Sequence, residues 1–149
     1  GGATLLTGLT VNDRVNAADW SIQGNIQAGG KIYGDRDYMI KKLPTGLAGL
    51  DWIRTANDSK KFTNPILATF TVTTDAEVYV AHDDRLTVRP AWMAGFSDTG
   101  EDLVINDDRS EPVVFSIYKN RYPANTKVSL GNNGGSSECC QYVVIVKAD

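Results

Sequence analysis

A dense polar cluster, His82-Asp83-Asp84-Arg85, directly follows the apolar run Val78–Ala81. A polar cluster at the end of a strand is well placed for recognition, because a rigid sheet holds it in position. The guanidinium of Arg85 can donate a fixed fork of hydrogen bonds, and the neighbouring carboxylates can accept them from hydroxyl groups. The structural alternative is that the two aspartates shape a turn while Arg85 forms an internal ion pair. The sequence leaves both interpretations open.

Three other segments place cations or aromatic side chains in expected loops. The segment Trp52–Lys61 carries Arg54, but its polar residues also suit an ordinary turn anchored by a buried tryptophan. Trp92 follows a proline between two expected strands; an exposed indole offers an apolar ring face and an N–H donor, whereas many tryptophans are buried. Lys119 and Arg121 lie beside two tyrosines, a pattern that suits either ligand contact or a loop packed over a sheet end.

Catalytic machinery is not evident. His82 is the only histidine, and the sequence has no nucleophile elbow, phosphate loop or dinucleotide fingerprint. The closely spaced aspartate pairs lack the spacing of a calcium loop, although a structural calcium stays open. Two carboxylates could serve a glycosidase, but adjacent aspartates in turns are usually solvated. We therefore expect no catalytic residues, no required cofactor and no assignable metal ligands.

The two cysteines, Cys139 and Cys140, are adjacent. Neighbouring cysteines cannot join distant segments, so they do not form the framework of a disulfide-rich fold. We favour two reduced cysteines, at least one of them packed as a small hydrophobic side chain. A disulfide between the two is the alternative. A zinc site is disfavoured because His82 is the only imidazole available as a further ligand.

The bulk composition is that of one ordinary globular domain. The chain has 149 residues, of which 42% are hydrophobic and 22% charged, and its formal net charge is -3. This balance disfavours nucleic acid as a partner, since nucleic-acid binders normally carry a basic surface. No run of about 18 apolar residues occurs, so we expect neither a transmembrane helix nor a membrane partner.

Period-two alternation dominates the secondary-structure signal. In Pro65–Thr74, Phe70 and Val72 alternate with threonines, which directs one face to a core and the other to water. Glu77–Ala81 resumes this character after a turn, and the two runs are predicted to form a hairpin. Further strands are predicted at 38–42, 52–55, 112–118, 126–130 and 141–147. Helical turns are predicted at 47–50 and 90–94.

Many short strands separated by turns predict an all-β fold, an antiparallel β-sandwich of jelly-roll-like type. The glycine-rich segment 131–137 is predicted to be the loop that reverses the chain before the last strand. We expect residues 1–149 to form a single module, excised from a larger protein.

A set of short strings extends from Gly34 over most of the chain. They are Gly34–Tyr38, Leu43-Pro44, Trp52–Asp58, Val78–Arg85, Pro90–Trp92, Gly95-Phe96, Thr99-Gly100, Tyr118, Pro123-Ala124, Leu130-Gly131 and Tyr142–Val144. Together they resemble the accessory β-sandwich modules of bacterial polysaccharide lyases and glycoside hydrolases, some of which are carbohydrate-binding modules. The resemblance implies a secreted, extracellular bacterial parent enzyme, with its catalytic domain and a polysaccharide as partners.

The functional expectation is a non-catalytic carbohydrate-binding module that targets its parent enzyme to its substrate. If the cations Arg54, Arg85, Lys119 and Arg121 converge, an acidic polysaccharide is the preferred ligand, because guanidinium–carboxylate contacts are charge-assisted. The alternatives are a structural domain that packs on the catalytic domain without binding sugar, and a small enzyme. The candidate ligand-binding residues are Arg54, His82, Asp84, Arg85, Trp92, Lys119 and Arg121.

Overall fold

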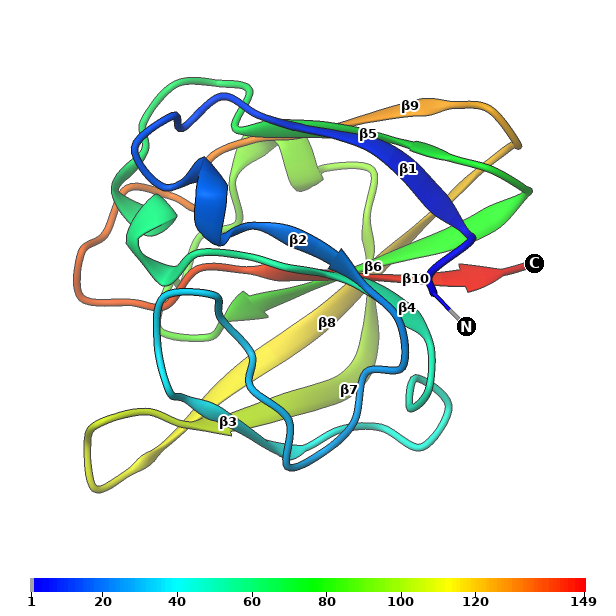
Figure 1. Ribbon diagram of the computed structural model, residues 1–149. Coiled ribbons are helices and arrows are strands. Elements are labelled where there is room, and N and C mark those ends of the chain that lie inside the picture. Colours follow the sequence, from blue (N-terminus) through cyan, green and yellow to red (C-terminus); the bar gives the residue numbers. More distant parts are fainter. Residues whose placement is uncertain (1) are drawn as a thin grey trace.

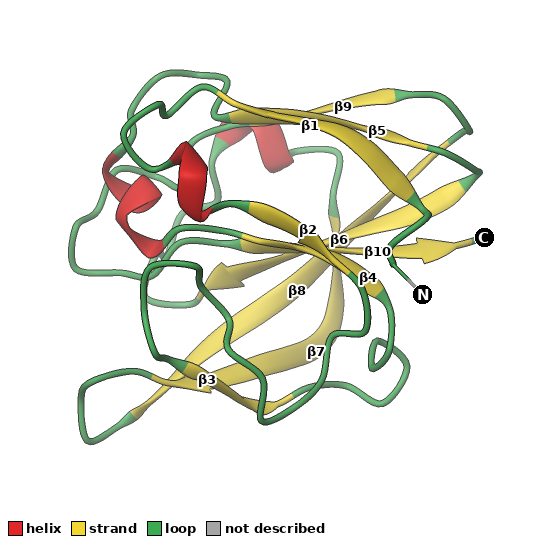
Figure 2. Cartoon of the chain, in the orientation of Figure 1, coloured by secondary structure: helices red, strands yellow, loops and turns green. Residues whose placement is uncertain are grey.

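The computed structural model describes residues 2–149, which form two packed β-sheets (Figure 1). The strands are β1 (Leu6–Val11), β2 (Ser21–Gln23), β3 (Met39–Lys42), β4 (Asp51–Arg54), β5 (Ala68–Val72), β6 (Ala76–Asp83), β7 (Ser97–Asn106), β8 (Pro112–Tyr122), β9 (Lys127–Leu130) and β10 (Val143–Ala148). Three 3-10 helices connect them: η1 (Ala17–Asp19), η2 (Asn57–Lys61) and η3 (Ala91–Met93). Figure 2 shows these short helices gathered towards one end of the strands. No helix within residues 2–149 is long and apolar enough to cross a membrane.

The two sheets have the strand orders β1-β5-β9 and β2-β4-β10-β6-β8-β7-β3. Every neighbouring pair of these strands is antiparallel. The larger sheet curls beneath the smaller one in Figure 1, and both chain ends lie at the right of the view. The predicted all-β, antiparallel β-sandwich is therefore confirmed.

The central strands of the larger sheet are apolar on both faces because each face has its own core. On β10, Val144 and Val146 pack into the core between the two sheets. Val143 and Ile145 point to the opposite face, where the segment 24–50 contributes Ile26, Ile32, Tyr33, Ile40 and Leu47 to a second core. A strand buried on both faces reads as a continuous apolar run rather than an alternating one. This explains the uninterrupted sequence VVIV at 143–146.

Two details differ from the sequence-based predictions. The strands β5 and β6 do not form a hairpin, because β5 belongs to the smaller sheet and β6 to the larger. Phe70 on β5 and Val80 on β6 instead face the same core from opposite sheets. The predicted helical turn at 47–50 is an irregular turn, whereas η3 confirms the one at 90–94.

Candidate functional site

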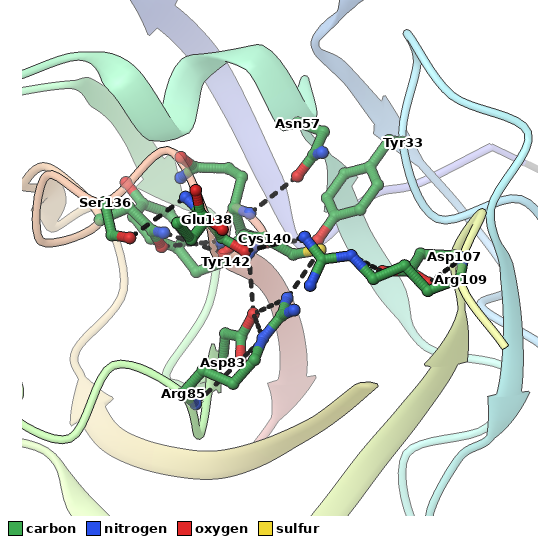
Figure 3. Close-up of polar contacts among 12 residues, drawn as sticks. Tyr33, Asn57, Asp83, Arg85, Asp107, Arg109, Ser136, Glu138, Cys140 and Tyr142 are labelled. Carbon is green, nitrogen blue, oxygen red and sulfur yellow. Dashed lines mark hydrogen bonds and ion pairs between the residues drawn. The ribbon is translucent and has the colours of Figure 1, made fainter. Parts of the chain in front are cut away.

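A buried ion pair stands where β6 ends. The Asp83 side chain is fully buried, and its Oδ2 accepts hydrogen bonds from Arg85 Nη2 at 2.6 Å and from the Cys140 backbone N–H at 2.7 Å. Its Oδ1 accepts from the backbone N–H and the Nε of Arg85 at 2.9 and 3.1 Å. Figure 3 shows Arg85 folded over Asp83 towards Cys140. The ion-pair alternative for Arg85 is thus what the structure contains, and it fixes the orientation of the guanidinium.

A second set of buried hydrogen bonds ties the glycine-rich loop to this end of the sheet. The Asn133 side chain donates to the Cys140 carbonyl at 2.8 Å and accepts from the Tyr142 N–H at 3.0 Å. The Asn133 carbonyl lies 3.0 Å from His82 Nε2. Since a carbonyl only accepts, His82 carries its proton on Nε2. The structure thus places His82 inside the sheet end: it is 2% exposed and its Nε2 is engaged by the loop.

Burial gives His82 a testable pH signature. Desolvation lowers the pKa of His82 from its usual 6.5, so the unfolded chain takes up a proton before the folded one does. Its stabilising contribution is complete above pH 6.5 and is lost progressively as the pH falls towards the folded-state pKa, at up to about 1.4 kcal/mol per pH unit for one proton. We expect urea unfolding to show this loss between pH 7 and 5. His82→Gln, which keeps a donor but does not titrate, should flatten it; an unchanged slope would contradict the assignment.

A groove of about 600 Å³ opens in front of the Asp83–Arg85 pair. It is lined by Asp84, Arg85 and the segment 109–114, which closes the β7–β8 connection and begins β8. We name it the Arg85 groove. Figure 3 shows Arg109 approaching from the other side of Arg85. Within residues 2–149, no hydrogen bond engages Arg85 Nη1, so this nitrogen is free to donate to a bound molecule.

Two positive and two negative side chains line the Arg85 groove. Asp84 Oδ1 accepts from the N–H and Oγ of Ser116 at 3.0 and 2.5 Å. The Arg109 side chain is 55% exposed; its Nη2 donates to the Glu138 carbonyl at 3.4 Å. Glu111 is exposed at the rim. With Arg85, these groups place two cationic hydrogen-bond donors and two carboxylate acceptors in one groove, and their formal charges cancel.

A smaller cavity of about 430 Å³ lies beside Trp92 and is lined by Thr63, Pro65, Pro90, Ala91, Trp92, Asn132, Gly134 and Gly135. We name it the Trp92 pocket. The indole is half-buried, and its N–H donates to the Asn132 carbonyl at 2.8 Å. Its ring packs against Tyr142 and Phe96, with centroid distances of 5.3 and 6.0 Å. Trp92 is therefore partly buried against Tyr142 and Phe96 and partly exposed in the Trp92 pocket, so each of the two alternatives left open by the sequence applies in part.

The position of the Trp92 indole depends on Gly131. A Cβ added at Gly131 would overlap the indole ring, so Gly131→Ala must displace Trp92 or the loop. We expect the free energy of unfolding to fall by about 1–3 kcal/mol and tryptophan emission to shift to longer wavelength. Gly46→Ala is the control, because a Cβ at Gly46 meets nothing within 4 Å. Equal effects of the two substitutions would contradict this packing.

Three predicted ligand-binding residues lie away from the groove and on strands: Arg54 at the end of the strand predicted at 52–55, and Lys119 and Arg121 where a loop was expected. Arg54 is on β4, where its Nε donates to the Lys31 carbonyl and its guanidinium covers Trp52 at 5.2 Å. Lys119 and Arg121 are on β8, opposite Tyr79 and Glu77, whereas Phe115 is opposite Asp83. At about 3.3 Å per residue, they lie roughly 13 and 20 Å along the strand from the Asp83 position. The four predicted cations therefore do not converge.

The exposed cations on β8 have partners of their own. Lys119 Nζ pairs with Glu77 at 3.0 Å, and Arg121 pairs with Asp149 at 2.5 Å. These carboxylates raise the pKa of Lys119 and of Arg121. Solvent screens such surface pairs, so they contribute little to stability.

The residues that line the other side of the Arg85 groove were not predicted from the sequence. Arg109, Ser110 and Glu111 lie in the connection between β7 and β8, and β7 was not predicted because most of its residues are polar and exposed. The signal that could have found them is the run Asn106–Glu111, six polar residues directly before the predicted strand at Pro112. A charged turn between two long paired strands projects from the sheet end.

The cysteines are buried thiols. Cys139 and Cys140 are 4% and 3% exposed and form no disulfide, as favoured from the sequence. Burial raises the pKa of Cys140, which disfavours the reactive thiolate. Among residues 2–149, no three His, Cys, Asp or Glu side chains gather where they could hold a metal ion.

The geometry described so far defines a β-sandwich with a preformed groove at one end. No protein-family model and no curated protein matches the sequence. A β-glucuronidase from glycoside hydrolase family 2 contains a similar fold, with a TM-score of 0.80 and 23% identity over 94% of this chain. A glycoside hydrolase family 138 enzyme targeting pectin rhamnogalacturonan II gives a TM-score of 0.60 and 14% identity over 100% of the chain. The chain spans 14% and 17% of these proteins, so it has the fold of one domain of a glycoside hydrolase.

Proposed function

We propose that this chain is a non-catalytic carbohydrate-binding module of a larger, secreted bacterial enzyme that degrades polysaccharides. The Arg85 groove is the proposed binding site. The single observation that carries the proposal is that one groove presents two guanidinium donors and two carboxylate acceptors, at the end of a sandwich whose fold occurs in two glycoside hydrolases. Tethering a catalytic domain to its polymer raises the local substrate concentration, so modest affinity suffices.

The chemistry of the groove favours an uncharged, hydroxyl-rich ligand. Arg85 Nη1 and the exposed Arg109 can donate to sugar oxygens, while Asp84 and Glu111 can accept from hydroxyls. An acidic polysaccharide would gain from several unopposed cations at one place. The groove holds two cations opposed by two carboxylates, and Lys119 and Arg121 are distant. A neutral polysaccharide is therefore the preferred class.

The state of His82 supports a role without catalysis. Its Nε2 is engaged by the Asn133 carbonyl, and its side chain is closed off from solvent. A general base must reach the proton that it abstracts, and buried His82 does not face the Arg85 groove. No cofactor enters the proposal.

Few large hydrophobic side chains are exposed in the described part of the chain. A domain that only packs on a catalytic domain should expose a contiguous apolar patch. Among residues 2–149, the exposed large hydrophobic side chains come from four separate segments: Val15, Met39, Ile66 and Val88. The structural accessory domain stays the alternative, and its partner would be the parent catalytic domain.

The proposal is tested by electrophoresis of the isolated chain in gels containing soluble xylan, galactomannan, polygalacturonate or alginate. Retardation by a neutral polymer is expected, and it should not depend on calcium or chelator. Retardation by the two acidic polymers alone, abolished by salt, would overturn the neutral preference. Unchanged mobility in all four gels would support the structural alternative.

A further inference from the structure

We propose that the Trp92 pocket is a second subsite, which takes the C–H face of an uncharged sugar unit from the same polysaccharide chain that occupies the Arg85 groove. This inference rests on the proposed function and names the kind of ligand more closely. The ligand is then a linear chain of several units, rather than a single terminal sugar, and it presents hydroxyls at one point and an apolar ring face at another.

The lining of the Trp92 pocket suits an uncharged, apolar ligand surface. No charged side chain lines the Trp92 pocket. The amide of Asn132 donates to the carbonyls of Thr63 and Asn64 at 3.1 and 3.2 Å, and its Oδ1 accepts from the Gly134 N–H at 3.1 Å. The indole N–H is also engaged. What remains is mainly carbon surface from the indole, two prolines and an alanine, which suits the apolar face of a sugar ring.

The aromatic surface of the pocket is held in place by its neighbours within the fold. Trp92 is held between Gly131, Tyr142 and Phe96, and its N–H bond to the 131–138 loop sets the ring orientation. A preorganised ring loses little conformational entropy on binding. Trp20 and Trp52 are 6% and 3% exposed, which leaves Trp92 as the tryptophan that lines a cavity in the described part of the chain.

Two loops connect the Trp92 pocket with the Arg85 groove. Arg85 lines the groove, and Pro90 lines the pocket, five residues further along one loop. Five residues span at most about 18 Å, a distance within reach of an oligosaccharide of a few units. The 131–138 loop also touches both sites: the Glu138 carbonyl accepts from Arg109, and Gly134 lines the pocket. The sites are therefore held at a fixed spacing by the same two loops.

The variant that tests this inference is Ala91→Glu, which places a charged side chain in the pocket from an exposed position of η3. Ala94→Glu is the matched control, because Ala94 is exposed next to the same helix and does not line the pocket. The probes are the neutral polymer that retards the chain, xylan or galactomannan, and short fragments from its partial hydrolysis. Affinity and tryptophan fluorescence are measured together.

We expect Ala91→Glu to weaken binding of the long polymer at least about tenfold, because linked subsites reinforce each other. Binding of fragments too short to span both sites should change far less. The polymer should alter tryptophan emission in the wild type and in Ala94→Glu. Wild-type affinity of Ala91→Glu, with no change of emission and with binding that still requires Arg109, would overturn the second subsite and leave the proposed function intact. No binding of xylan or galactomannan by the wild type would overturn both.

Discussion

Arg85→Ala should lower the free energy of unfolding by about 3–5 kcal/mol, because it leaves a fully buried carboxylate without its cation. The Asp83 side chain is 0% exposed and takes three of its hydrogen bonds from the Arg85 side chain. Arg85→Lys should lie between alanine and wild type, since an ammonium keeps the charge but not the bidentate fork. The measurement is urea unfolding at neutral pH, with the m-value checked in each variant.

Arg121→Ala is the control for this stability effect. Arg121 also pairs with an aspartate, but its side chain is 59% exposed, and little change in unfolding free energy is expected. A loss for Arg85→Ala no larger than that for Arg121→Ala would contradict the central position of the Asp83–Arg85 pair. It would also remove the reason for treating the Arg85 groove as preformed.

Arg109→Ala should weaken binding of the retarding polysaccharide by about 10-fold to 100-fold, the range for losing hydrogen bonds from a charged group. Unlike Arg85, Arg109 is 55% exposed and its aspartate contact is long, at 3.8 Å. The Asp107 carboxylate is itself buried, at 3% exposed, but in the alanine variant it keeps its hydrogen bond from the backbone N–H of residue 109. The loss of unfolding free energy should therefore be smaller than for Arg85→Ala, and affinity is compared under conditions where the variant is folded. Affinity is measured by calorimetry or by the dependence of gel mobility on polymer concentration.

The comparison variant for binding is again Arg121→Ala. It removes the same residue type at similar exposure, 59% against 55%, from a position far along β8. Its affinity should match the wild type. If Arg121→Ala loses more affinity than Arg109→Ala, the binding site lies at the Tyr122 end of β8, near the predicted residues Lys119 and Arg121.

The fold was predictable from the sequence because alternation and turns are local signals. The strands β5, β8, β9 and β10 fall within or close to predicted runs. Sheet membership was not predictable: β5 and β6 are consecutive and both apolar, yet they face one another across a core. Which strands share a sheet depends on side-chain packing between distant segments, and the alternation within one strand does not report it.

Only one side of the candidate site, the side formed by Asp84 and Arg85, was predictable from the sequence. The cluster at 82–85 marked the end of β6, but sequence could not show that Asp83 is the buried partner that orients Arg85. Arg109 reaches the groove through the pairing of β7 with β8, and β7 is mostly polar because much of it faces solvent. The opposite error concerns Lys119 and Arg121: β8 continues to Tyr122, so the expected loop is the end of a long strand.

The most direct test of the account is the site at which the polysaccharide binds. Short fragments of the retarding polymer are titrated into the isotopically labelled chain, and backbone amide shifts are followed by NMR. We predict the largest shifts at Asp84, Arg85 and residues 109–111, 113 and 114, with smaller ones at Lys119 and Arg121; Pro112 has no amide N–H to follow. Shifts concentrated at Lys119 and Arg121, or no shifts at concentrations where the polymer retards the chain, would contradict the assignment of the Arg85 groove as the binding site.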